Sequence, residues 1–231
     1  MVLRTPLCKR QLPAYSRGQD IANMVTHIVG GSIGVAVLVL SVIIAAMHRN
    51  VYGVIGGSIY GASMIALYTV SSVYHGLRPG YAKKVMQVID HCTIYFLIAG
   101  TYTPILLSAI RPQAPALAWT MFGIEWGLLA FAVVFAAIDH RRYAALTMIC
   151  YIGMGWCIIF ATRAAVRAMS AAGFLWLLAG GIIYTVGGVI YALKLPIFNA
   201  KHKFFGSHEV FHLFVMGGSI CHFIFMYLYV A

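Results

Sequence analysis

Apolar residues run through this chain in long stretches that short polar breaks separate. Roughly 20 apolar residues are enough for a helix to cross the hydrocarbon core of a membrane, and runs this long without alternation favour helices over strands. The stretches that qualify are residues 22–47, 53–76, 87–110, 117–138, 144–162, 173–194 and 207–230. The pattern predicts an all-α membrane protein in which residues 22–231 form a single domain, a bundle of seven transmembrane helices.

Composition agrees with this pattern. Hydrophobic residues make up 62% of the chain and charged residues only 9%, whereas a soluble domain has about 25% charged residues. The net charge is +11, but no basic tract with interleaved aromatic residues indicates nucleic-acid binding. Membrane proteins collect Lys and Arg in loops that face the cytoplasm, which explains the excess.

The placement of these cations predicts the direction of the helices. The N-terminal tail and the loops after the second, fourth and sixth helices hold twelve of the 16 Lys and Arg residues. The positive side faces the cytoplasm, so residues 1–21 are expected to form a cytoplasmic N-terminal segment and the C-terminus to lie outside. The first apolar run is longer than that of a signal peptide, which predicts a retained first helix.

Small residues and cysteines add two expectations. Gly53, Gly57 and Gly61 repeat at every fourth position of the second helix, as do Gly30 and Gly34 of the first. This spacing lets helix backbones approach closely, either inside the bundle or in a homodimer. The cysteines are odd in number and without a C-x-x-C pair, which argues against a disulfide framework; they are Cys8, Cys92, Cys150, Cys157 and Cys221.

Polar residues gather at the predicted cytoplasmic ends of four helices, although ionisable groups are costly in a membrane. Ser71 and His75 are four residues apart at the end of the second helix, so they share one face. The starts of the first, third and seventh helices carry the others: Asp20, Asn23 and His27; Asp90 and His91; His208, Glu209 and His212. These side chains are therefore expected to meet at one leaflet.

This convergence predicts a zinc site. A catalytic zinc has three protein ligands and water; His208 and His212 can supply two ligands and His75 the third. Asp90 would then hold the metal-bound water as base or orienter, and zinc lowers the pKa of that water to about 7. The run His208–His212 also matches the H-E-x-x-H pattern of metalloproteases. Since the third ligand would come from another helix, Asp90 is favoured over Glu209 as the base.

The remaining ionisable residues receive separate interpretations. Glu125 lies inside the fourth predicted helix and is a functional candidate by its depth, without a named partner. Asp139 is expected in a solvated loop, and His222 in the packed core. The histidines expected in loops are His48, His140 and His202.

Four motifs resemble the hemolysin III family, the bacterial branch of the progestin and adipoQ receptors. They are DIANMVTH (20–27), SSVYH (71–75), IDHCTIYFLIAGTYTPILL (89–107) and HEVFHLFVMGGSICHFIF (208–225), with Asp20 where the family usually has Glu. The resemblance implies seven helices, a cytoplasmic N-terminus and a bacterial inner membrane. It also implies zinc on His75, His208 and His212, with Ser71 and Asp90 as the matching serine and aspartate of the site.

The wider superfamily includes alkaline ceramidases, which implies a metal-dependent amide hydrolase that acts on lipids. Two functions stay open: a zinc hydrolase that cleaves an amide or ester of a membrane lipid, and a regulator of membrane state with a structural zinc. A transporter or channel is disfavoured, because the polar residues gather at one end instead of lining a path. The candidate catalytic residues are Asp90 and Ser71.

Overall fold

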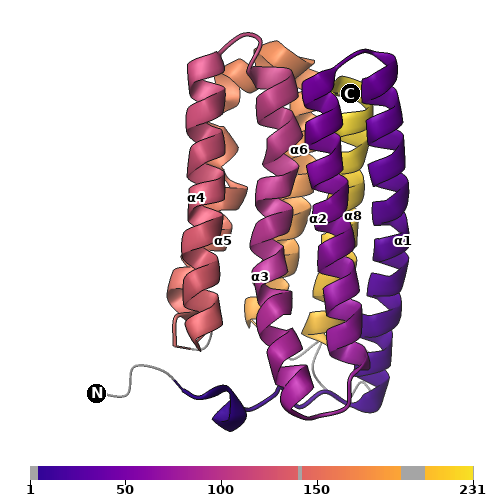
Figure 1. Cartoon of the computed structure of the whole chain (residues 1–231), viewed down its shortest axis with the longest axis vertical. Coiled ribbons are helices and arrows are strands. Elements are labelled where there is room, and N and C mark those ends of the chain that lie inside the picture. The colour runs from indigo at the N-terminus through magenta and orange to yellow at the C-terminus, as the bar shows by residue number, and fades with distance from the viewer. Residues whose placement is uncertain (1–4, 140–141, 194–205, 231) are drawn as a thin grey trace.

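The computed structural model describes residues 5–139, 142–193 and 206–230, and within these ranges it is helical with no strand. The long helices stand side by side as an elongated bundle (Figure 1). Their bounds are α1 Arg17–Met47, α2 Val51–Gly76, α3 Tyr81–Pro104, α4 Pro115–Asp139, α5 Ala144–Gly155, α6 Thr162–Leu193 and α8 Ser207–Tyr229. Three short helices, Leu7–Lys9, Ile105–Ile110 and Cys157–Ala161, precede α1, extend α3 and follow α5.

Local sequence explains where the helices begin and change. Ser16 and Gln19 form a capping box at the start of α1: the Gln19 amide donates to Ser16 Oγ at 3.1 Å, and the Ser16 amide donates to Gln19 Oε1 at 2.9 Å. Asn50 caps α2 through Gly53 N at 2.9 Å. Pro104 has no amide hydrogen to donate within α3, and the chain continues as a π-helix over Ile105–Ile110.

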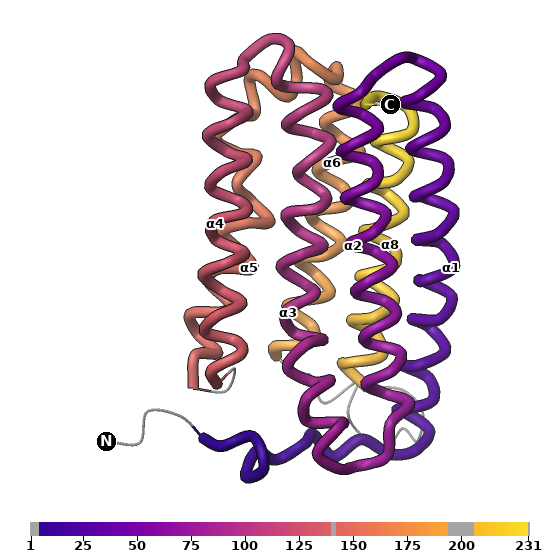
Figure 2. Tube along the Cα trace, in the orientation of Figure 1, coloured from indigo at the N-terminus to yellow at the C-terminus, as the bar shows by residue number. Residues whose placement is uncertain are grey.

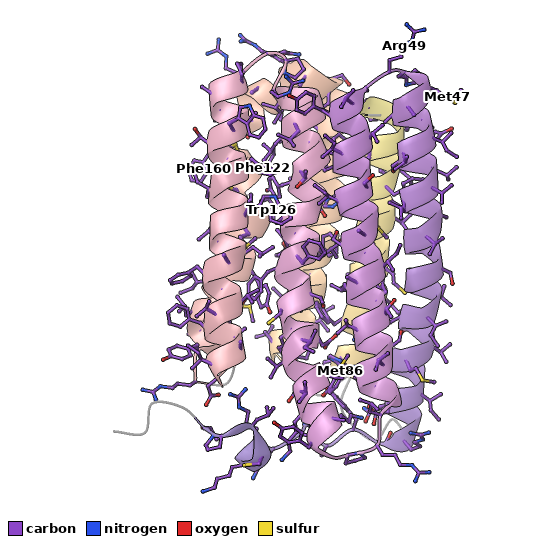
Figure 3. The ribbon with its side chains drawn as sticks, in the orientation of Figure 1. Met47, Arg49, Met86, Phe122, Trp126 and Phe160 are labelled. Atoms are coloured by element: carbon purple, nitrogen blue, oxygen red, sulfur yellow. The ribbon has the colours of Figure 1, made fainter. Side chains whose placement is uncertain are left out.

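Six helical stretches of the described residues are long and apolar enough to cross a membrane. Their outer faces carry exposed aliphatic side chains, for example Ile28 (52% exposed), Val35 (51%) and Val134 (54%). Such extensive apolar exposure would be unfavourable in water. The chain is therefore a multi-pass membrane protein, and Figure 3 shows side chains projecting along the full height of the bundle.

The predicted fifth and sixth helices differ most from expectation. The polar break 162–170 between the two predicted helices is helical up to residue 169 and belongs to α6. The break lies at Ser170, whose φ of 64° and ψ of 168° are not helical. The stretch 194–203, predicted as the next loop, lies outside the described residues, as do His140 and His202.

The glycine faces of α1 and α2 pack against each other inside the chain. A Cβ built on Gly57 would lie 2.8 Å from Cβ of Ser41, and one on Gly30 would lie 2.6 Å from Cδ1 of Tyr68. Real Cβ atoms do not approach this closely, so only glycine fits at these positions. This is the arrangement that the intrachain alternative requires, and it places the start of α1 beside the end of α2 (Figure 2).

Candidate metal centre

Three histidines that lie far apart in the sequence come together at one end of the bundle. His75 lies in the last turn of α2, and His208 and His212 lie in the first two turns of α8. Each offers a ring nitrogen, and these nitrogens lie within 4.8 Å of one another. His75 and His212 are buried, whereas His208 is half-buried. The structure thus brings together the three residues proposed from sequence as ligands.

The donor chemistry of this cluster fits zinc. Nε2 of His75 and Nε2 of His208 are 3.2 Å apart, and two nitrogens on one tetrahedral zinc would be roughly 3.3–3.4 Å apart. Nδ1 of His208 and Nδ1 of His212 are buried without a hydrogen-bond partner. Three neutral imidazoles form a usual ligand set for a zinc that keeps one position open.

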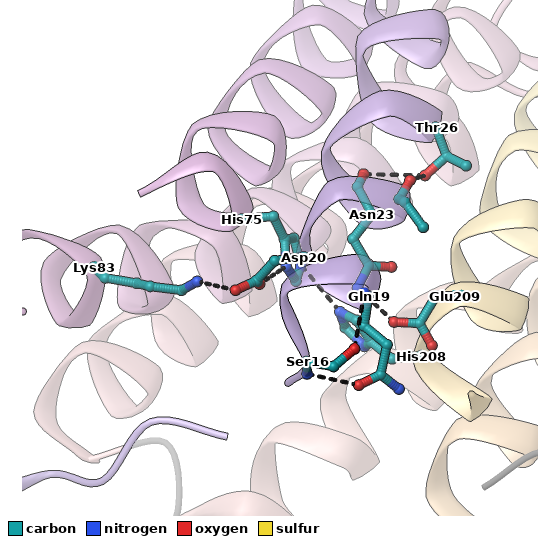
Figure 4. Close-up of polar contacts among 10 residues, drawn as sticks. Ser16, Gln19, Asp20, Asn23, Thr26, His75, Lys83, His208 and Glu209 are labelled. Carbon is teal, nitrogen blue, oxygen red and sulfur yellow. Dashed lines mark hydrogen bonds and ion pairs between the residues drawn. The ribbon is translucent and has the colours of Figure 1, made fainter. Parts of the chain in front are cut away.

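A carboxylate from α1 orients the first of these rings. Nδ1 of His75 lies 3.1 Å from Oδ1 of Asp20, and Oδ2 of Asp20 accepts from Nζ of Lys83 at 2.8 Å, as Figure 4 shows. A hydrogen bond on Nδ1 leaves Nε2 free to face His208. Carboxylates behind metal-binding histidines fix the tautomer and raise the basicity of the ligand. Lys83, counted from sequence among the loop cations, is only 3% exposed and belongs to α3.

This arrangement predicts a measurable effect of Asp20→Asn. The amide keeps the size of the carboxylate but loses its charge, so the zinc affinity of the protein should fall about 10- to 100-fold. Competition with a chromophoric chelator would measure it. Glu125→Gln replaces a buried carboxyl group that has no contact with the histidines and serves as the control. Equal affinities of Asp20→Asn and the wild type would contradict the orienting role.

The two candidate catalytic residues lie next to each other. Ser71, 2% exposed, stands one turn before His75, and its hydroxyl is close enough to hydrogen-bond with the half-buried carboxylate of Asp90. His91, the neighbour of Asp90, bonds instead to its own helix, with Nδ1 at 2.7 Å from the carbonyl oxygen of Gln87. Within the described residues, the three histidines are the group that could hold a metal, so Asp90 stands outside the ligand set.

Glu209 turns toward α1. Its Oε1 accepts from Nδ2 of Asn23 at 2.7 Å, and its Oε2 is buried without a partner. The ring of His27, one turn after Asn23, stacks on His212 with centroids 3.6 Å apart. In the sequence, the four-residue spacing of Asn23 and His27 indicated only that they share one face of a helix. The contact of His27 with the ring of His212 depends on how α1 packs on α8.

The other ionisable residues divide between confirmed and wrong interpretations. His222 is buried, with Nε2 at 3.1 Å from the Leu177 carbonyl oxygen, which confirms its place in the core. His48 lies in the turn after α1, also as expected. The solvated loop predicted for Asp139 is wrong: this residue is 3% exposed and its Oδ2 accepts from the amide of Thr5 at 3.1 Å. Glu125 is fully buried beside the Cys157 thiol.

Comparisons with known proteins cover nearly the whole chain. A family model described as "Haemolysin-III related" matches residues 15–223. The chain is 36% identical to "Hemolysin-3" of Bacillus cereus over 212 residues, which cover 92% of each chain. It is 35% identical to the "Hemolysin-3 homolog" of Bacillus subtilis (strain 168) over 87% of this chain and 89% of the relative. A more distant relative is the human "Monocyte to macrophage differentiation factor", 28% identical over 91% of this chain and 85% of its own.

Proposed function

Because the chain belongs to the haemolysin III family, we propose that it is a zinc-dependent membrane hydrolase that cleaves an amide or ester of a membrane lipid at the cytoplasmic leaflet. The observation that carries this proposal is the cluster of His75, His208 and His212, whose ring nitrogens lie within 4.8 Å of one another at one end of a membrane bundle. A site at the end of the bundle lies at the depth of lipid headgroups, where an amide or ester linkage would be found.

The proposed topology has seven passes, with the N-terminus in the cytoplasm of a bacterium and the protein in its inner membrane. The long stretch Ala144–Leu193 holds 50 residues, and a straight helix of that length would be about 75 Å long, more than twice the hydrocarbon thickness of about 30 Å. The non-helical backbone at Ser170 supports a division of this stretch into two passes. The start of α1 and the end of α8 lie at opposite ends of the bundle (Figure 1), which supports an odd number of passes.

The residues around the cluster have separate proposed roles. Zinc, when bound, supplies a Lewis acid that polarises a carbonyl and lowers the pKa of water. Asp20, with Lys83 behind it, holds the ring of His75 so that Nε2 faces the other ligands. Asp90 accepts the proton of the attacking water on a carboxylate oxygen, and Ser71 orients that carboxylate through its hydroxyl.

Removal of the metal tests this proposal. The purified protein in detergent, incubated with a panel of ceramides, acylated amino lipids and glycerolipids, should release free fatty acid. Treatment with a chelator should abolish this release, and added zinc should restore it, because the histidine cluster alone has no electrophile. Mass spectrometry of the released fatty acid gives the measurement. Hydrolysis that survives the complete loss of zinc would refute the proposal.

A second function is favoured by one observation. The ligand histidines lie on α2 and α8, and the pair Asp20 and Lys83 extends the contacts of His75 to α1 and α3. A bound metal would therefore tie four helices together, as a regulator of membrane state with a structural zinc requires. If the protein binds zinc tightly and cleaves none of the lipids in the panel, this function replaces the hydrolase.

A further inference from the structure

Residues 5–16, here called the N-terminal strap, cross the end of the bundle that carries the histidines. The strap enters beside the end of α4 and leads into α1 on the other side, as Figures 1 and 2 show. Apart from the short turn Leu7–Lys9, it contains no helix. It therefore lies across this end of the bundle and outside the membrane-spanning helices.

Specific contacts hold the strap against the end of α4. Nη2 of Arg10 donates to the carbonyl oxygen of Ile138, and Nε of Arg10 donates to the carbonyl oxygen of Thr5 at 3.1 Å. The Thr5 amide donates to the Asp139 carboxylate at 3.1 Å. Arg10 is only 4% exposed, which is unusual for an arginine in a terminal segment. This part of the strap is thus anchored by buried polar contacts.

Two more contacts fix the rest of the strap. Nζ of Lys84, in the first turn of α3, donates to the carbonyl oxygen of Cys8 at 2.6 Å. The capping box of Ser16 and Gln19 sets the angle at which the strap enters α1. Anchors on α4, α3 and α1 together determine where the residue before the cap, Tyr15, must lie.

Tyr15 lies directly on the histidine cluster. Its ring stacks on His208 with centroids 5.1 Å apart and planes 23° apart, and its centroid is 5.6 Å from that of His75. The ring is thus an aromatic cover over two of the three proposed ligands.

We infer that the strap closes the aqueous side of the metal centre, and that Tyr15 is the residue that selects against water-soluble ligands. With this side closed, a substrate must approach between the helices, which admits a lipid and excludes a soluble amide or ester. The inference rests on the proposed function for its metal. The position of Tyr15 over the histidines is observed independently of any metal.

The zinc-loaded protein offers the first test, through the rate at which a water-soluble chelator removes the metal. Tyr15→Ala should release zinc at least about tenfold faster than the wild type, because the cover over His208 is gone. Tyr15→Phe keeps the ring and should release zinc at the wild-type rate. Arg10→Gln loosens the far anchor and should give an intermediate rate. Equal rates for Tyr15→Ala and the wild type would overturn the inference.

A second test needs no zinc and separates this inference from the proposed function. Diethylpyrocarbonate modifies accessible imidazoles, and mass spectrometry of metal-free protein can follow His208 against the exposed His48 as internal reference. Tyr15→Ala should accelerate the modification of His208 at least about tenfold and leave His48 unchanged. If the wild type binds no zinc but His208 reacts faster in Tyr15→Ala than in the wild type, the covering role of the strap is supported and the metal proposal fails. If His208 reacts at the same rate in both proteins, the strap fails whatever the metal content.

Discussion

His212→Ala should lower the zinc content of the purified protein from about one ion per chain to less than about one tenth, because two imidazoles do not hold zinc as three do. His212 is 2% exposed, and its ring centroid lies 4.5 Å from that of His208 and 5.3 Å from that of His75. No other described His, Cys, Asp or Glu joins this group. Inductively coupled plasma mass spectrometry of the monodisperse protein would measure the loss.

His222→Ala is the matched control for this experiment. It removes the same side chain from the same helix, and His222 is also buried, but its Nε2 faces the Leu177 carbonyl oxygen instead of the cluster. This variant should therefore keep its zinc. Equal zinc in His212→Ala and the wild type would refute the ligand assignment. Loss of zinc in both variants would show that zinc binding depends on the folding of α8 and not on one particular ligand.

Asp90→Asn should keep zinc and fold but reduce the turnover of a lipid substrate by about 10²–10⁴-fold, the usual contribution of a general base. The amide has nearly the shape of the carboxylate and can still bond to the Ser71 hydroxyl, yet it accepts no proton. Because Asp90 lies outside the ligand group, zinc affinity should change little. Single-turnover rates of fatty-acid release, measured with zinc content on the same sample, would separate the two effects.

Glu209→Gln tests the competing assignment of the base. Glu209 sits next to a ligand in sequence, but its Oε1 is engaged by Asn23, so its neutralisation should cost less activity than Asp90→Asn does. If Asp90→Asn hydrolyses lipid at the wild-type rate while Glu209→Gln does not, the H-E-x-x-H interpretation replaces ours. If Asp90→Asn loses zinc together with activity, Asp90 is a fourth ligand and the site is closed.

Local patterns predicted the helices well where membrane crossing alone determines them. The stretches 53–76 and 207–230 agree closely with α2 and α8, because an apolar run in lipid must satisfy its own backbone hydrogen bonds. The break predicted at 162–170 was too long, because Arg163 and Arg167 lie in a helix. The backbone leaves the helical conformation only at Ser170, the last residue of that stretch. A helix can continue past charged residues at a membrane surface, so polarity alone does not locate its end.

The three histidines illustrate what the sequence by itself determined. Their helical spacing and the alternating direction of the helices place His75, His208 and His212 at the same end of the bundle, and no knowledge of side-chain contacts is needed for this. The tertiary structure alone decided the surroundings: Asp20 behind His75, Lys83 behind Asp20, and Tyr15 over His208. Asp20 is 55 positions from His75 and 63 positions from Lys83 in the sequence. These contacts depend on how whole helices pack against one another. The hydrophobic period depends only on neighbours along the chain. A single sequence therefore shows the helices directly, whereas the contacts between distant residues are visible only in the folded protein.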